Sequence, residues 1–63
     1  MRIAVDVMGG DHGCRVVIDG VRKAFESGLK ITEAFLVGDQ AMISDALTTL
    51  SFHDPRVHTI HAS

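Results

Sequence analysis

The sequence has little of several residue types on which small proteins rely for stability. Of its 63 residues, one is a cysteine, one is a proline, and none is a tryptophan or a tyrosine. Cys14 therefore has no partner for a disulfide within the chain, which excludes a disulfide scaffold. A folded chain of this size buries only about 60% of the surface that its unfolded form exposes. We therefore expect it to need partner subunits or more polypeptide chain to be stable.

The patterns of charge and hydropathy exclude further classes of protein. The net charge is −2, with acidic and basic residues interspersed, so the basic patch of a nucleic-acid-binding protein is absent. No apolar run approaches the roughly 20 residues of a membrane-spanning helix. Met1 leads directly into a strand-like run without the features of a secretory signal, which is typical of a protein start. The single thiol fits a reducing, cytoplasmic compartment.

Short apolar segments alternate along the chain with segments of helical periodicity. The expected strands cover residues 2–7, 34–37 and 56–61, and the expected helices run from about 14 to 27 and from 39 to about 50. This alternation predicts a parallel sheet with right-handed crossovers. The fold class is therefore α/β, a βαβαβ half of a doubly wound parallel sheet. The mixed alternation of the third strand favours a position near a sheet edge.

Such a sheet is incomplete by itself, because parallel sheets are normally covered on both faces. We therefore expect residues 1–63 to be the N-terminal segment of a larger α/β domain, completed by more chain or another subunit. Within the segment, Gly28 is expected to end the first helix and Asp39 to cap the second. Gly20 lies inside the first helix, where it costs roughly 1 kcal/mol relative to alanine. We expect it there to allow close packing against a neighbouring element.

The loop at residues 8–13, Met-Gly-Gly-Asp-His-Gly, is the strongest candidate for chemistry. It follows the first strand at the carboxyl edge, where open α/β sheets bind ligands. Gly9 and Gly10 let the backbone approach an anion closely, and the helix that follows offers its positive end. Asp11 and His12 add a carboxylate and an imidazole that can carry a proton or a positive charge. The phosphate-binding candidates are thus Gly9, Gly10, Asp11 and His12, and the catalytic candidates are Asp11 and His12.

The same residues also allow a purely structural interpretation, in which Asp11 only caps the helix after a tight turn. The spacing does not separate the two interpretations. The loop contains no lysine and matches neither a Walker A sequence nor a G-x-G-x-x-G fingerprint, so we expect no nucleotide cofactor. For Gly38 and Asp39, at the end of the second strand, a turn with a helix cap is favoured over ligand contact.

Several other polar or reactive residues lie outside the loop. Asp6, a charge within an apolar strand, either points toward the loop or pairs with a local donor. Cys14 is expected to be a small buried residue rather than a nucleophile. His53, His58 and His61 suggest a metal site, but His58 and His61 are an odd number of residues apart. On a strand such residues face opposite sides, so we expect no metal.

The opening at residues 1–13, MRIAVDVMGGDHG, resembles the start of the PlsX-type phosphate acyltransferases of bacterial phospholipid synthesis, whose first strand ends in D-x-M-G-G-D-H. The similarity continues through Gly20, the FLVGD segment at 35–39 and residues 56–62, so it covers essentially the whole chain. The MGGDH cluster is specific at a protein start, whereas the LVGD turn is common. The family usually has a proline soon after the histidine, where this chain has Gly-Cys-Arg at 13–15, and its members are several times longer.

The resemblance implies an enzyme that moves a fatty acyl group from acyl carrier protein to inorganic phosphate, giving an acyl phosphate. It implies an isopropylmalate-dehydrogenase-like α/β/α sandwich and a cytoplasmic homodimer with peripheral membrane association in the full-length protein, and no cofactor. It carries over Gly9, Gly10, Asp11 and His12, flanked by Asp6 and Met8. We expect the isolated 63-residue chain to be inactive.

Two alternatives remain open on the same fold, because fold does not determine function. One is a small-anion-binding or dehydrogenase-like cofactor-binding module, against which the missing NAD fingerprint and the MGGDH start both argue. The other is a non-catalytic fragment that only folds or associates.

Overall fold

Strands and helices alternate along the chain as the sequence predicts. The computed structural model describes residues 1–9 and 13–62. The elements in chain order are β1 (Arg2–Asp6), α1 (Cys14–Glu26), β2 (Glu33–Gly38), α2 (Gln40–Thr49) and β3 (Val57–His61). This order confirms the predicted α/β class and the βαβαβ unit.

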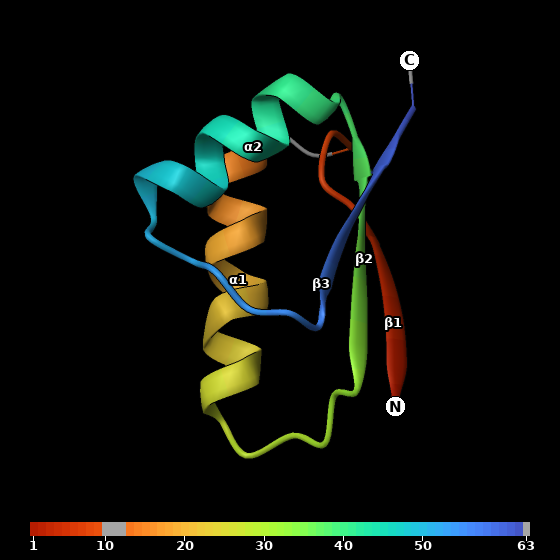
Figure 1. Ribbon diagram of the computed structural model, residues 1–63, viewed down its shortest axis with the longest axis vertical. Helices are drawn as coiled ribbons and strands as arrows, with labels where there is room; N and C mark the ends of the chain where they lie inside the picture. Colours follow the sequence, from red (N-terminus) through yellow and green to blue (C-terminus); the bar gives the residue numbers. More distant parts are fainter. Residues whose placement is uncertain (10–12, 63) are drawn as a thin grey trace.

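The three strands form one parallel sheet in the order β1-β2-β3, with β2 in the centre. The third strand therefore lies at a sheet edge, as its mixed alternation predicts. Figure 1 shows both helices on the same side of the sheet, which is where two successive crossovers of one hand place them. Neither helix in the described part of the chain is long and apolar enough to cross a membrane.

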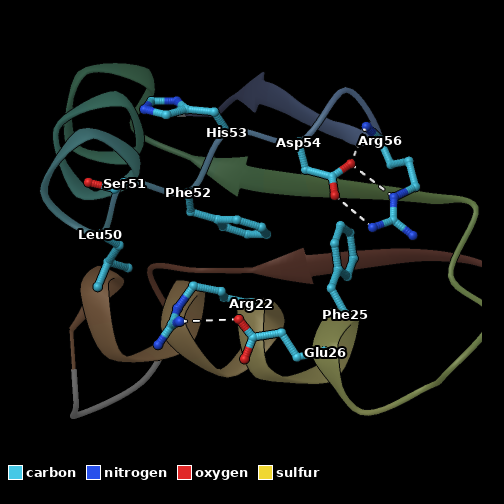
Figure 2. A pocket seen from close by; sticks show the side chains of 9 residues that line it. All are labelled: Arg22, Phe25, Glu26, Leu50, Ser51, Phe52, His53, Asp54 and Arg56. Carbon is cyan, nitrogen blue, oxygen red and sulfur yellow. Dashed lines mark hydrogen bonds and ion pairs between the residues drawn. The ribbon is translucent and has the colours of Figure 1, made fainter.

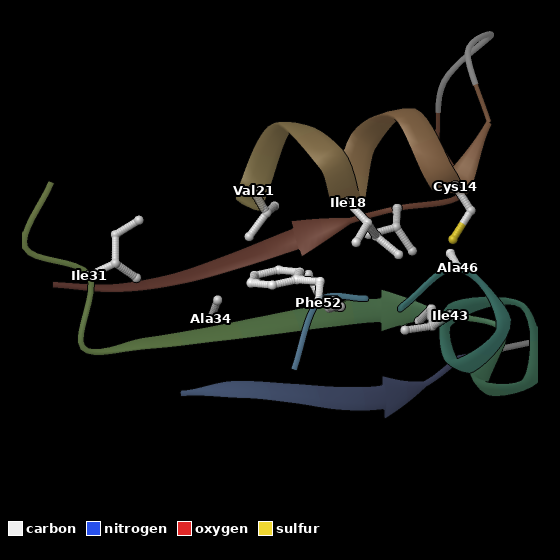
Figure 3. Close-up of a cluster of buried hydrophobic side chains, with 10 residues drawn as sticks. Cys14, Ile18, Val21, Ile31, Ala34, Ile43, Ala46 and Phe52 are labelled. Atoms are coloured by element: carbon white, nitrogen blue, oxygen red, sulfur yellow. The ribbon is translucent and has the colours of Figure 1, made fainter. Parts of the chain in front are cut away.

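The hydrophobic core lies between the sheet and the two helices. Ile18 of α1, Leu36 of β2 and Ile43 of α2 are all completely buried there. Figure 3 shows that the buried side chains of α1 point toward the sheet. The full buried set is Val7, Cys14, Ile18, Val21, Ile31, Ala34, Leu36, Ile43, Ala46 and Phe52. These residues recur at helical spacing in the helices and alternate in β2, so burial follows the period of each element.

The opposite face of the sheet has no helix over it among the described residues. Phe35 of β2 stacks on His58 of β3 there, with 5.1 Å between the ring centroids. Arg2 of β1 pairs with Glu33 of β2, its Nε 3.0 Å from the carboxylate oxygen Oε2. Ile60 of β3 remains 46% exposed. A parallel sheet with one face in solvent is unusual, and the expectation that further structure packs here stays a prediction.

Three residues at the ends or in the interior of the helices have structural roles that were predicted from the sequence. Gly28 has φ +88 and follows the end of α1, which confirms it as the helix stop. Asp39 caps α2, because its side chain accepts a hydrogen bond of 3.0 Å from the backbone N–H of Met42. The expectation for Gly20 was wrong. A Cβ at Gly20 would have nothing within 4 Å, because this residue lies on the solvent side of α1.

The side chain of Arg56 links the amino end of β3 to α1 (Figure 2). We call Arg56 and its partner Asp54 the arginine clamp. Arg56 donates to both carboxylate oxygens of Asp54, from Nε at 2.9 Å and Nη2 at 2.6 Å. Its guanidinium lies 4.3 Å from the centre of the Phe25 ring, and Nη1 donates to the carbonyl of Ile31 at 3.2 Å. A pocket of about 310 Å³ lies beside the clamp, at the opposite end of the sheet from the loop that follows β1.

The clamp should make stability depend on acid pH. The hydrogen bonds from Arg56 lower the pKa of Asp54 from 3.8 to about 2. Because the folded pKa lies below the unfolded one, the stabilisation is complete above pH 3.8 and is lost as the pH falls through about 2. Asp54→Asn should remove this acid-dependent part of the unfolding free energy of the intact protein, measured by urea unfolding across that range. Glu26→Gln is the control, and parallel curves for Asp54→Asn and the parent would contradict the prediction.

Candidate functional site at the carboxyl edge of the sheet

The carboxyl ends of the strands and the N-termini of both helices lie at the same end of the molecule. In Figure 1 the chain that leaves β1 turns at this end of the sheet, where α2 begins and β3 ends. Of the four predicted phosphate-binding residues, only Gly9 belongs to the described part of the chain. Gly10, Asp11 and His12 lie outside the described residues, so their assignments to phosphate binding and catalysis stay predictions.

Gly13 leads the chain into α1. It is the N-cap residue of the helix, with φ +83 and ψ 163, a combination that essentially only glycine adopts. The alternative interpretation, in which Asp11 caps the helix, lies outside the described residues and stays untested. This role of Gly13 was not predicted from the sequence. The available signal was a glycine directly before a helical pattern, where a capping side chain is more usual.

Asp6 pairs with a local donor, and it does so at the start of the loop. Its Oδ1 accepts a hydrogen bond of 3.0 Å from the backbone N–H of Met8. A Cβ added to Gly9 would lie 2.8 Å from Oδ2 of the same carboxylate. The two interpretations of Asp6 thus describe one arrangement, in which the carboxylate points from the end of β1 into the loop and pairs there.

Gly38 is the close-approach glycine of this region, a role that its sequence context did not reveal. A Cβ at Gly38 would lie 2.5 Å from Cγ of Met8 and 3.0 Å from Cγ2 of Val7. The last residue of β2 therefore has no side chain because the chain leaving β1 crosses it. The neighbouring Asp39 acts as a helix cap, as the sequence predicts, so the favoured structural interpretation of this pair is supported.

The two helix N-termini differ in how their backbone N–H groups are satisfied. At α2 the N–H of Gln40 donates to Nδ1 of His61 at 3.1 Å, and Asp39 accepts from Met42. At α1 the N-cap is Gly13, and no described side chain caps the helix. The first turn of α1 contains no acidic residue and has Arg15 exposed. The N-terminus of α1 is therefore the more favourable place for an anion.

Cys14 is buried, and His58 and His61 face opposite sides of the sheet, as predicted from the sequence. Cys14 is 7% exposed in the core, and burial, together with the negative charge of Asp39, raises the pKa of its thiol. A buried neutral thiol is a poor nucleophile. His58 stacks on the helix-free face, whereas His61 bonds to α2 on the other side. Within residues 1–9 and 13–62, no three potential metal ligands come together.

Comparison with known proteins places this chain in a family. The family model described as "Fatty acid synthesis protein" matches residues 1–63. The chain belongs to the fatty acid synthesis protein family. This membership confirms the resemblance inferred from the MGGDH opening.

Relatives of this fatty acid synthesis protein segment include several bacterial proteins named phosphate acyltransferase. Those of Bacillus subtilis (strain 168) and Oleidesulfovibrio alaskensis are 52% and 47% identical to it, over 98% and 97% of the chain. That of Lacticaseibacillus casei is 44% identical over 97%. The chain spans 17% of the length of the first two relatives and 16% of the third.

Proposed function

We propose that this segment supplies the phosphate-binding side of an acyltransferase site. In the full-length enzyme, a fatty acyl group would pass from acyl carrier protein to inorganic phosphate. The observation that supports this most is the N-terminus of α1. It has a glycine at the N-cap and an exposed arginine in its first turn, and it lies at the carboxyl edge of the sheet. The 52% identity to a protein named phosphate acyltransferase gives the reaction class.

The reaction needs a phosphate held in one orientation beside a thioester. A phosphate oxygen attacks the thioester carbonyl carbon, so a carbon–oxygen bond forms. The carbon–sulfur bond then breaks, and the leaving thiol takes up the proton that phosphate gives up. No oxidation state changes, so the reaction as written needs no redox cofactor. Positioning and charge neutralisation are therefore the main tasks of the protein.

The residues of the segment fit different parts of that task. In the proposal, backbone N–H groups from Gly9 through the first turn of α1 hold the phosphate. Arg15 adds positive charge nearby. Asp11 and His12 orient the phosphate or assist proton transfer. We place residues 1–63 in the N-terminal part of a larger α/β domain, and the remaining chain of that domain provides the acyl carrier protein site. In the same proposal, the whole protein is a cytoplasmic homodimer that associates peripherally with membranes.

The proposal is tested in a full-length enzyme in which this segment replaces the corresponding part of the Bacillus subtilis relative. This protein, called the full-length enzyme below, should form acyl phosphate from acyl carrier protein thioester only when phosphate is present. Asp11→Asn should lower the turnover about a hundredfold and change the midpoint of thermal unfolding little. Glu26→Gln, an acid-to-amide change at the far end of α1, is the control.

Two results would count against the proposal. If the parent enzyme makes no acyl phosphate, or makes product without phosphate, the proposed function is wrong. If the parent is active but Asp11→Asn loses activity only in step with its loss of folded protein, Asp11 is a structural residue.

A further inference from the structure

Where the chain leaves the sheet after β1, the side chain of Asp6 replaces β2 as the acceptor of a backbone hydrogen bond. The N–H of Val7 makes a bond to β2, donating to the carbonyl of Val37 at 3.1 Å. The next N–H, that of Met8, donates instead to Oδ1 of Asp6 at 3.0 Å. An aspartate that accepts from the backbone two residues ahead fixes a turn. The direction in which the loop starts is therefore set by the side chain of Asp6.

The same carboxylate explains why residue 9 is a glycine. The three nearest atoms to a Cβ at Gly9 all belong to Asp6, with Oδ2 at 2.8 Å, Cγ at 3.1 Å and Oδ1 at 3.5 Å. The φ of Gly9 lies outside the left-handed region, so its backbone conformation is open to other residues. A side chain at position 9 would have to push the carboxylate away from the N–H of Met8.

Met8 is held from a second side as well. Its side chain crosses Gly38 of β2, where a Cβ would lie 2.5 Å from Cγ and 3.3 Å from the sulfur of Met8. Residue 8 is thus fixed through its N–H by Asp6 and through its side chain by the end of β2. The backbone that enters the loop has little freedom left before it reaches Gly9.

We propose that Asp6 is a positioning residue for phosphate, which acts by fixing the turn at Met8 and Gly9. This inference rests on the proposed function. The carboxylate lies on the Cβ side of Gly9 and occupies that side of the backbone. Phosphate then approaches from the side of the α1 N-terminus. Asp6 contributes geometry, and its charge is dispensable.

An asparagine separates geometry from charge, because its side-chain oxygen can accept the same hydrogen bond in the same turn. In the full-length enzyme, Asp6→Ala should raise the KM for phosphate about tenfold, since a hydrogen bond to a charged group is lost. Asp6→Asn should stay within about threefold of the parent, because the acceptor remains. The KM for the acyl donor should change little in both variants, and Glu26→Ala serves as the control for losing an exposed acid.

A double-mutant cycle tests the contact between Asp6 and Gly9. Gly9→Ala should raise the KM for phosphate when Asp6 is present. In the Asp6→Ala background it should add almost nothing, because the carboxylate that it would strike is gone. Additive effects of the two changes would overturn the proposal. So would an unchanged KM for phosphate in Asp6→Ala, or equal damage from Asp6→Asn and Asp6→Ala.

The four proteins of the cycle are the parent, Asp6→Ala, Gly9→Ala and the double variant. Their midpoints of thermal unfolding distinguish this test from the test of the proposed function. If the parent enzyme shows no dependence on phosphate, the proposed function and the phosphate role of Asp6 both fail. The coupling between Asp6 and Gly9 would then still appear as non-additive shifts in the midpoint. If the parent depends on phosphate but the cycle is additive, the proposed function stands and Asp6 is not its positioning residue.

Discussion

Replacing Gly10 with valine in the full-length enzyme should raise the KM for phosphate by about ten- to a hundredfold, the loss of one or two charge-assisted hydrogen bonds. A branched side chain in the middle of the loop would keep the phosphate away from the backbone N–H groups. Gly10 belongs to the predicted phosphate-binding loop. In the chain it lies between Gly9 and Gly13, the N-cap residue of α1. The KM for the acyl donor should change little, because the proposal places the site of that substrate in the rest of the protein.

Gly20→Ala is the matched control for this experiment. It removes a glycine from the same segment, but at a position where an added Cβ meets nothing within 4 Å. Its phosphate kinetics should equal those of the parent, and its thermal stability should rise slightly because alanine is the better helix former. An unchanged KM for phosphate in Gly10→Val, in a folded enzyme, would remove the loop from the phosphate site.

The isolated 63-residue chain should be inactive, and it should be either associated or partly unfolded in dilute solution. Both β1 and β3 are edge strands, and edge strands present unpaired N–H and C=O groups to other molecules. The helix-free face also exposes Ile60 and part of Phe35. Analytical ultracentrifugation and amide hydrogen exchange measure the two properties directly.

A variant of the exposed face makes that test more specific. Ile60→Lys places a charge on the helix-free face, so it should shift an associated chain toward the monomer. A monodisperse parent monomer with protected amides in all three strands would contradict the prediction. It would mean that the segment is a self-sufficient domain.

The fold was predictable because each element carries its own periodicity. The alternating burial of β2 and the cap at Asp39 are local features, and local features can be read from the sequence. The prediction of close packing at Gly20 was wrong because it rested on the mid-helix position of this residue. It did not take account of the distance of Gly20 from the apolar stripe of α1. That stripe, which contains Ile18 and Val21, defines the buried face of α1.

The candidate site was less predictable because its geometry depends on the register between strands. Asp6 lies opposite Val37 in the sheet, and this register brings Met8 against Gly38. No local pattern specifies that contact. The motif predicts an anion site after the first strand, which is also where the topology of the sheet favours one. The reason for glycine at position 9 is evident only from the structure, in which the carboxylate of Asp6 lies where a Cβ would point.

The location of bound phosphate tests the central claim most directly. A crystal structure of the full-length enzyme with inorganic phosphate should place the anion within hydrogen-bonding distance of backbone N–H groups in residues 9–15. It should lie on the α1 side of Gly9, away from Asp6. Phosphate bound at a different part of an active enzyme, with this loop and the start of α1 making no contact to it, would contradict the claim.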